Sequence, residues 1–122
     1  MFETQLDAAR NRLIIQYKGR VSPEELTRCN EEVAQHLTKL QSGFSLLTDL
    51  TDLDSMDVAC VPQIRAMMDR CNKRGVKTVV RSVPDPHKDI GLNILSLFHY
   101  GRGVHIVTCA TMQEALQALN TE

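Results

Sequence analysis

Hydrophobic and polar positions alternate at the start of this chain with the short period of β-strands. Phe2 to Asp7 alternates apolar and polar side chains, and Leu13 to Tyr17 is rich in Leu, Ile and Tyr. Only residues 8–11 connect these two runs, and Asn11 favours a turn. We therefore predict a hairpin whose first strand is antiparallel to the second and lies at an edge of a sheet.

Four later stretches place apolar residues three and four positions apart, which is typical of amphipathic helices. The first has a strong start, because Ser22, Pro23 and Glu25 form a capping box with proline at the first helical position. The second begins near Pro62, after an irregular turn from Asp57, and ends before Gly75. The four predicted helices span residues 23–40, 62–74, 86–100 and 112–119.

Three apolar runs between the helices predict buried strands at Phe44 to Leu47, Val76 to Val80 and Val104 to Thr108. The element order is then β-β-α-β-α-β-α-β-α. Right-handed crossovers on such an order give one mixed, mostly parallel sheet covered by helices. The predicted fold is α/β, a single domain over residues 1–122 with about five strands and four helices.

Composition excludes several functions. The net charge is -1 and there is no Trp, which argues against nucleic-acid binding. No apolar run approaches the roughly 20 residues that span a bilayer, and the first residues do not form a signal peptide, so we expect no membrane insertion and a cytoplasmic location. The four cysteines are far apart, which predicts reduced, buried thiols and no metal site or other cofactor.

An acidic loop follows the Phe44 strand and contains Asp49, Asp52, Asp54 and Asp57. In an open α/β sheet, ligands and partners dock at the carboxyl ends of the strands, so this loop is a candidate docking surface for a basic partner. The spacing does not fit an EF-hand calcium loop. The alternative is that these carboxylates are solvated or cap the next helix, as Asp57 is placed to do.

A second candidate lies between the Val76 strand and the helix that starts near Pro86. Arg81, His87 and Lys88 could hold a phosphate or carboxylate at the start of that helix. The alternative is an ordinary capped surface helix, because Asp85 and Asp89 offset the positive charge. No spacing of cysteine, histidine and carboxylate predicts a catalytic site, so we predict that the chain is not an enzyme.

The element order and the acidic loop resemble the STAS domain, the fold of bacterial anti-sigma factor antagonists. That family carries Asp-Leu, five residues, and Met-Asp-Ser-Ser-Gly between the third strand and the second helix. Here Asp49-Leu50 and Met56-Asp57 stand in register with that motif, five residues apart. Val58, Ala59 and Cys60 replace Ser-Ser-Gly. The resemblance implies a protein-binding regulator without the family's serine phosphorylation switch, unless Ser55 is a displaced phosphosite.

Two hypotheses follow from these observations. The first is a non-enzymatic module that docks a signalling protein, such as an anti-sigma-factor-like protein, or a second copy of the chain through a helix face or the edge strand. Its predicted partner-binding residues are Asp52, Asp54, Ser55, Met56, Asp57, Val58 and Cys60. The second is a carrier or sensor of a lipid, nucleotide or other anion held between the 49–57 loop and the helix start near residue 86. An apolar cavity lined by Met67, Met68, Leu92 and Phe98 would favour it, whereas a flat or convex surface there would favour partner binding.

Overall fold

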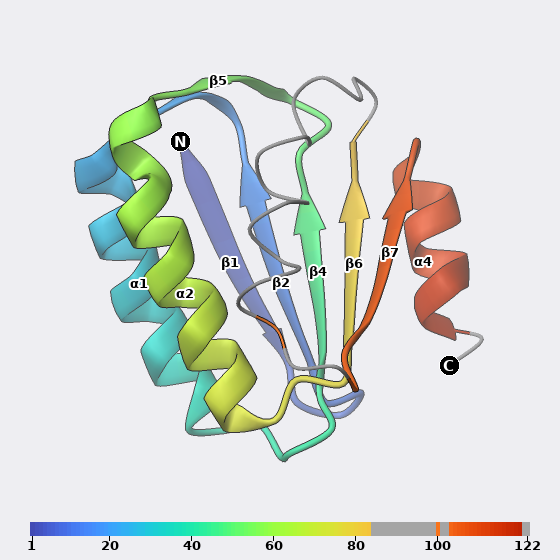
Figure 1. Cartoon of the computed structure of the whole chain (residues 1–122). Helices are drawn as coiled ribbons and strands as arrows, with labels where there is room; N and C mark the ends of the chain where they lie inside the picture. The colour runs from blue at the N-terminus through green and yellow to red at the C-terminus, as the bar shows by residue number, and fades with distance from the viewer. Residues whose placement is uncertain (84–99, 101–102, 121–122) are drawn as a thin grey trace.

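The computed structural model describes residues 1–83, 100 and 103–120, which form a sheet with helices on both faces (Figure 1). The strands are β1 (Phe2–Asp7), β2 (Arg12–Tyr17), β3 (Gly19–Val21), β4 (Ser45–Asp49), β5 (Leu53–Met56), β6 (Thr78–Ser82) and β7 (His105–Cys109). The α-helices are α1 (Pro23–Leu37), α2 (Val61–Arg74) and α4 (Met112–Asn120), and a short 3-10 helix, η1 (Val58–Cys60), precedes α2.

Five strands form the main sheet in the order β1-β2-β4-β6-β7. β1 is antiparallel to β2, whereas the pairs β2–β4, β4–β6 and β6–β7 are parallel. The predicted hairpin and the edge position of the first strand are confirmed, and the sheet is mixed as predicted. The carboxyl ends of the parallel strands lie together at the top of Figure 1.

The two faces of the sheet bury different sets of residues. In β2, Leu13, Ile15 and Tyr17 point toward α1 and α2 and are at most 1% exposed, whereas the residues between them are half-buried. On the other face, α4 packs over the neighbouring strands and buries Leu47 and Val80. The main core therefore lies between the sheet and the α1–α2 pair.

Local sequence signals set the ends of the helices. Ser22 Oγ accepts a hydrogen bond from the backbone N–H of Glu25 at 3.2 Å, and a Glu25 carboxylate oxygen accepts one from the Ser22 N–H at 3.4 Å. The predicted capping box is confirmed. Gly75 ends α2 in the left-handed conformation, with φ of 95°, which glycine adopts without steric cost. α1 ends at Leu37, one turn earlier than predicted.

Of two other predictions, the described residues do not test the first and show the second to be wrong. The described residues contain three α-helices instead of four, and the predicted helix at 86–100 lies almost wholly on residues 84–99, outside the described part. The segment after β4 is not only a loop, because Leu53–Met56 forms strand β5 and pairs in parallel with β3. This small second sheet, which crosses the top of the molecule in Figure 1, depends on a contact between distant segments that periodicity does not reveal.

Candidate functional site

The candidate site starts where β4 ends, at a carboxylate that is held inside the fold. Asp49 is 6% exposed. Its Oδ2 accepts a hydrogen bond from Gln16 Nε2 at 3.0 Å, and its Oδ1 accepts bonds from the backbone N–H of Thr51 at 3.0 Å and from the Thr51 hydroxyl. A buried carboxylate with these partners fixes the turn out of the sheet. Asp49 therefore positions the site and does not present its charge to a partner.

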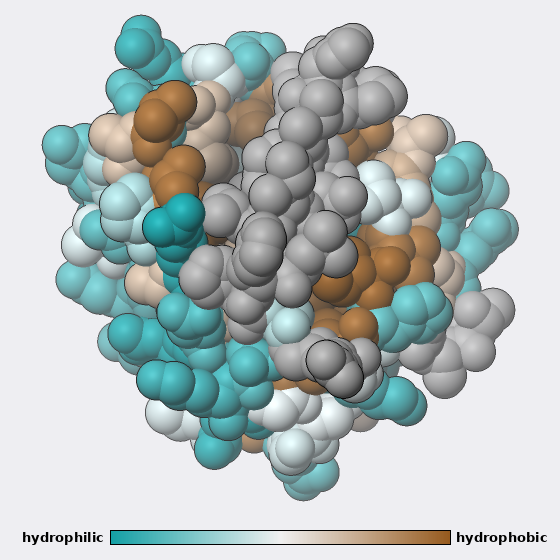
Figure 2. Space-filling view, viewed as in Figure 1, coloured by the Kyte–Doolittle hydropathy of each residue, from teal (hydrophilic) through white to brown (hydrophobic). Residues whose placement is uncertain are grey.

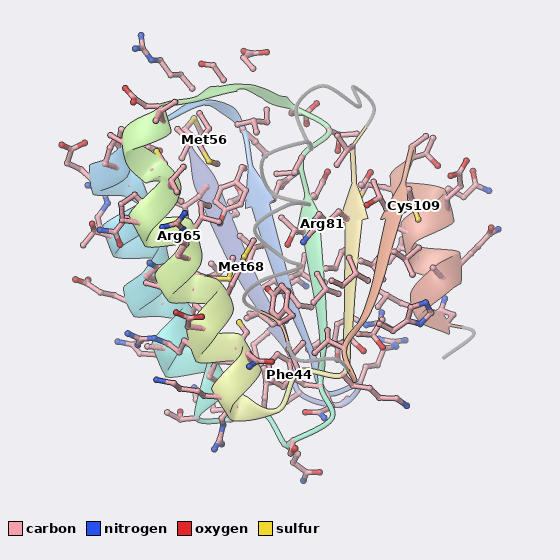
Figure 3. All side chains as sticks on the ribbon, in the orientation of Figure 1. Phe44, Met56, Arg65, Met68, Arg81 and Cys109 are labelled. Atoms are coloured by element: carbon pink, nitrogen blue, oxygen red, sulfur yellow. The ribbon has the colours of Figure 1, made fainter. Side chains whose placement is uncertain are left out.

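The small β3–β5 sheet carries the next part of the chain across the top of the main sheet. The Gly19 N–H donates to the Asp52 carbonyl at 2.9 Å, which joins the two strands. Leu53 is 3% exposed, and Met56 packs against the core near the start of α2 (Figure 3). These two apolar anchors turn the polar residues between them outward. The exposed polar side chains here are Asp52, Asp54 and Ser55.

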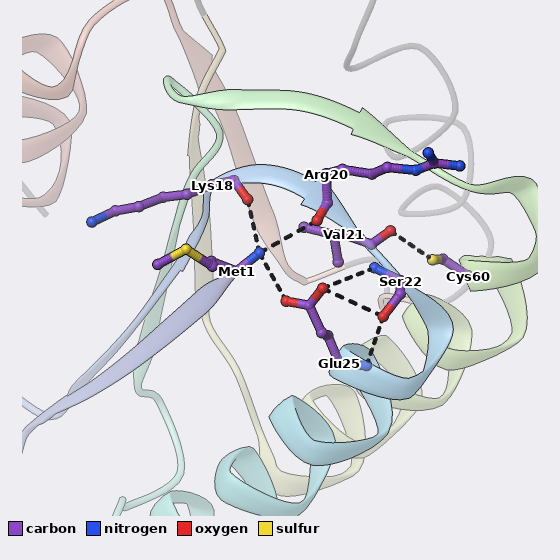
Figure 4. A network of polar contacts seen from close by, with 7 residues as sticks. All are labelled: Met1, Lys18, Arg20, Val21, Ser22, Glu25 and Cys60. Carbon is purple, nitrogen blue, oxygen red and sulfur yellow. Dashed lines mark hydrogen bonds and ion pairs between the residues drawn. The ribbon is translucent and has the colours of Figure 1, made fainter.

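The turn into α2 combines a cap, an exposed apolar residue and a buried thiol. Asp57 Oδ1 accepts a hydrogen bond from the Ala59 N–H at 2.8 Å, so Asp57 caps the 3-10 helix η1 and not α2, whose N-cap residue forms no side-chain cap hydrogen bond. Val58 is 84% exposed. Cys60 is 1% exposed, and its thiol donates to the Val21 carbonyl at 3.6 Å (Figure 4). Cys60 thus lies beneath the surface, which corrects the expectation that it contacts a partner directly.

We name residues 52–59 the acidic segment. It exposes three carboxylates and Val58, and hydrophobic atoms stand out from hydrophilic surface at the upper left of Figure 2, where α2 begins in Figure 1. Arg20 on β3 is the register partner of Ser55 in the small sheet, so the neighbouring strand contributes one exposed cation. The segment keeps a net negative charge around an exposed apolar side chain. This combination suits a protein surface that is basic at its rim and apolar at its centre.

The predicted anion site is only partly described. Arg81 lies on β6, in register with Thr48 of β4 and Thr108 of β7, and is 2% exposed (Figure 3). Tyr100 is also buried, and burial raises its pKa well above the ordinary tyrosine value, while the charge of Arg81 acts in the opposite direction. Arg81 is therefore an interior residue of the sheet. His87 and Lys88 lie outside the described residues, and the anion site stays a prediction.

The predicted ligand cavity, like the anion site, is only partly described. Met67 and Met68 are buried on α2, at 4% and 2% exposure. Leu92 and Phe98 lie outside the described residues. The ligand hypothesis therefore rests on the sequence and not on a described pocket.

All four cysteines are free and buried, as predicted. Burial raises the pKa of the Cys29 thiol to about 11 and that of Cys71 to about 12. It also raises the pKa of Cys60 and Cys109. These thiols are protonated at neutral pH, which makes them poor nucleophiles and poor metal ligands. Within the described ranges, no group of three His, Cys, Asp or Glu residues could hold a metal, and no helix is long and apolar enough to cross a membrane.

Sequence reasoning missed the residues whose hydrogen bonds position Asp49 and Cys60. Gln16 and Thr51 fix Asp49, and the carbonyl of Val21 receives the Cys60 thiol. The spacing of Asp49 and Thr51 is a typical Asx turn and could have been recognised. The roles of Gln16 and Val21 depend on strand pairing and carry no local signal.

No protein-family model matches the chain, and no curated protein matches it. Solved structures do. One is an uncharacterized protein from Shewanella loihica PV-4, of the DUF3478 family with a SpoIIAA-like fold, with a TM-score of 0.75, 13% identity, and coverage of 97% of this chain and 93% of that one. Another is the anti-sigma factor antagonist SpoIIAA in its unphosphorylated form, with a TM-score of 0.68, 14% identity and full coverage of both chains.

A third similar chain comes from the complex of the diguanylate cyclase SiaD with its activator SiaC from Pseudomonas aeruginosa. It has a TM-score of 0.59 and 14% identity, and the match covers 88% of this chain and 92% of that one. Identities this low concern the fold and not the activity. The order of the strands, the helices on both faces and these neighbours together identify the fold of this chain as SpoIIAA-like, the STAS fold.

Proposed function

We propose that this chain is a non-enzymatic regulatory module, acting in the cytoplasm, that binds a partner protein through the acidic segment. The observation that carries the proposal is Val58, an apolar side chain that is 84% exposed and directly follows the exposed Asp57. Single exposed apolar residues are common on protein surfaces, but this one lies at the carboxyl edge of the sheet, where partners dock in open α/β folds. Similar folds occur in anti-sigma factor antagonists and in the SiaD–SiaC complex, which are regulatory proteins by their descriptions.

The segment is held in one conformation before any partner arrives. Leu53 and Met56 anchor β5 to the core, and the Asp49 hydrogen bonds fix the preceding turn. The Asp57 cap then holds the turn into α2. A surface that is already ordered loses little conformational entropy on binding, which favours affinity. The expected partner carries Lys or Arg side chains around a small apolar pocket that receives Val58.

Binding in this proposal is not switched by a serine at the start of α2. Val58 and Ala59 hold the positions of the two motif serines, so no hydroxyl is present there to accept a phosphate. A phosphate would add nearly two negative charges at a helix N-terminus and change the affinity of the surface for a basic partner. The module therefore binds constitutively, unless Ser55, which is exposed on β5, takes over as a phosphosite.

The test is affinity capture from cytosolic extract with the wild-type protein and Val58→Asp. Because Val58 is almost fully exposed, the substitution changes the free energy of unfolding by no more than about 0.5 kcal/mol. A buried interface side chain, by contrast, contributes about 2 kcal/mol or more when it is a hot spot, which corresponds to roughly a 30-fold loss of affinity. We expect wild type to retain a partner that Val58→Asp does not.

Leu116→Asp is the matched control. Leu116 is 39% exposed on α4, which covers the other face of the sheet. The Leu116→Asp variant should capture the same partner as wild type, because it introduces the same charge as Val58→Asp on a surface away from the acidic segment. Equal capture by Val58→Asp and Leu116→Asp would remove the acidic segment from consideration as the docking site.

A further inference from the structure

A shallow groove lies between the C-terminal halves of α1 and α2, far from the acidic segment. It encloses about 530 Å³. Its lining residues, which we name the basic groove, are Ala34, Leu37 and Thr38 of α1 and Arg70, Lys73 and Arg74 of α2. The floor is apolar and the α2 side is cationic. No carboxylate belongs to the lining, although the exposed Asp69 is next to Arg70 along α2.

The three cations of the groove have different roles. Arg74 is fixed, because its Nε donates to the Leu37 carbonyl at 2.8 Å and one of its terminal nitrogens donates to the Leu40 carbonyl at 3.1 Å. It therefore satisfies carbonyl groups at the end of α1. Arg70 and Lys73 are exposed and form no ion pair in the part of the chain that the structure describes. Their charge is available to a partner above the apolar floor.

The same chain carries a surface of the opposite character. The acidic segment exposes Asp54, Asp57 and Val58, and neither carboxylate forms an ion pair with a described residue. Figure 1 shows the segment leading into the start of α2, whereas the groove is lined by residues 70–74 at the other end of that helix. α2 has 14 residues, so these surfaces are separated by about 20 Å at 1.5 Å per residue. They cannot meet within one molecule.

We propose that the basic groove of one copy binds the acidic segment of a second copy, head to tail. Asp54 and Asp57 meet the cations Arg70 and Lys73, and Val58 covers the apolar floor. Opposite charges across an interface set its register and exclude other orientations. Because each copy keeps one free groove and one free segment, the contact is heterologous and produces a ring or an open chain of copies, not a closed two-fold dimer.

This inference goes beyond the proposed function and does not rest on it, although both use the acidic segment. The groove and an external partner would compete for that segment, so self-assembly would withhold the module from its partner. The contact as proposed involves the six lining residues of the groove and a short segment, so we expect assembly to be weak and to depend on protein concentration. Exposed charge pairs are screened by salt, so assembly should also decrease from about 0.05 M to about 0.5 M salt.

The test uses two variants that each disable one half of the contact. Arg70→Gln/Lys73→Gln disables the groove, and Asp54→Asn/Val58→Ser disables the segment while leaving the Asp57 cap in place. Sedimentation velocity over micromolar to millimolar concentrations should show the mass of wild type increasing and each variant remaining monomeric. An equimolar mixture of the two variants should form a dimer that does not grow, because one intact groove meets one intact segment.

Arg28→Gln/Arg65→Gln is the control, since it removes two exposed cations from the same helices outside the groove and should assemble like wild type. Circular dichroism and thermal midpoints confirm that all variants are folded. A wild type that stays monomeric at millimolar concentration would overturn the proposal, and so would a mixture that fails to dimerise. Partner capture by the groove variant is read separately: it tests the proposed function, because that variant has an intact acidic segment.

Discussion

Glu25 joins three parts of the chain, and its replacement should measure what that junction contributes to stability. One carboxylate oxygen accepts hydrogen bonds from the backbone N–H and the hydroxyl of Ser22, both at 3.4 Å. The other lies 2.8 Å from the α-amino group of Met1 (Figure 4). That amino group also donates to the carbonyl of Lys18 at 2.9 Å. Glu25 therefore links the start of β1, the β2–β3 corner and the cap of α1.

The magnitude follows from the two kinds of contact. The ion pair is exposed on the Met1 side, at 84%, so it contributes about 0.5 kcal/mol. The Glu25 half of the capping box contributes about 0.5–1 kcal/mol. Glu25→Gln keeps an acceptor for Ser22 and loses only the charge, and should cost about 0.5 kcal/mol. Glu25→Ala loses both contacts and should cost about 1–1.5 kcal/mol, which lowers Tm by about 3–6 °C in a domain of this size.

The pH dependence has a definite sign. The hydrogen bond and charge of the Met1 α-amino group lower the pKa of Glu25 below the ordinary value of a glutamate side chain, and the Ser22 contacts add to that effect. A carboxyl group whose pKa is lowered by folding contributes stability above its unfolded pKa and loses that contribution as the pH falls through the folded pKa. The difference in the free energy of unfolding between wild type and Glu25→Gln should therefore have its largest value near pH 6 and decrease as the pH falls below about 4.5.

The assay is thermal and urea unfolding of a chain that starts at Met1, at pH 6 and pH 3, with Glu24→Gln as the control. Glu24 is exposed in the same first turn of α1 and forms no ion pair with a described residue. It keeps the same favourable position near the helix N-terminus. Equal midpoints for Glu24→Gln and Glu25→Gln at pH 6 would refute the reasoning, because the contacts that distinguish them would then have no net effect.

Two further predictions concern the backbone and the thiols. Gly75→Ala should cost about 1–2 kcal/mol or more in urea unfolding, because φ is 95° there and the added Cβ would collide with the side chain of Ser42. Gly43→Ala is the control, because φ is 89° there but no atom lies within 4 Å, so it should show the cost of backbone strain alone. If Gly43→Ala loses as much stability as Gly75→Ala or more, the collision with Ser42 does not contribute. Cys29 and Cys71 should react with a thiol reagent no faster than the protein unfolds, since burial raises their pKa to about 11 and 12. Rapid labelling in native buffer would show that these thiols are accessible.

Local signals in the sequence were enough to predict most of the described helices and strands. The capping box at Ser22 and the left-handed glycine at residue 75 act within a few residues of the chain, so they could be recognised without tertiary information. The alternation of β2 and the short turn before it predicted the antiparallel edge of the sheet. The irregular turn after Asp57 was also recognisable, because proline cannot lie deep in a regular helix.

The acidic segment shows where local reasoning stopped. Four carboxylates close in sequence were predicted as one acidic loop, but Asp49 is buried and hydrogen-bonded, Asp57 caps a helix, and only part of the charge remains free at the surface. Cys60 was named among the partner-binding residues, but it is buried and its thiol donates to the Val21 carbonyl. Burial of each side chain depends on which segments the fold brings over it, and the sequence pattern near that residue does not contain this information.

The sequence by itself determined which stretches form most of the described helices and main-sheet strands, because caps, turns and periodicity act between residues a few positions apart. Only the tertiary structure decided that residues 53–56 pair with residues 19–21, and that α1 and α2 form a basic groove at the end opposite the acidic segment. Both features require segments about 30 or more residues apart to come together. Strand pairing and helix packing depend on the shape of the whole core, so no local pattern specifies them.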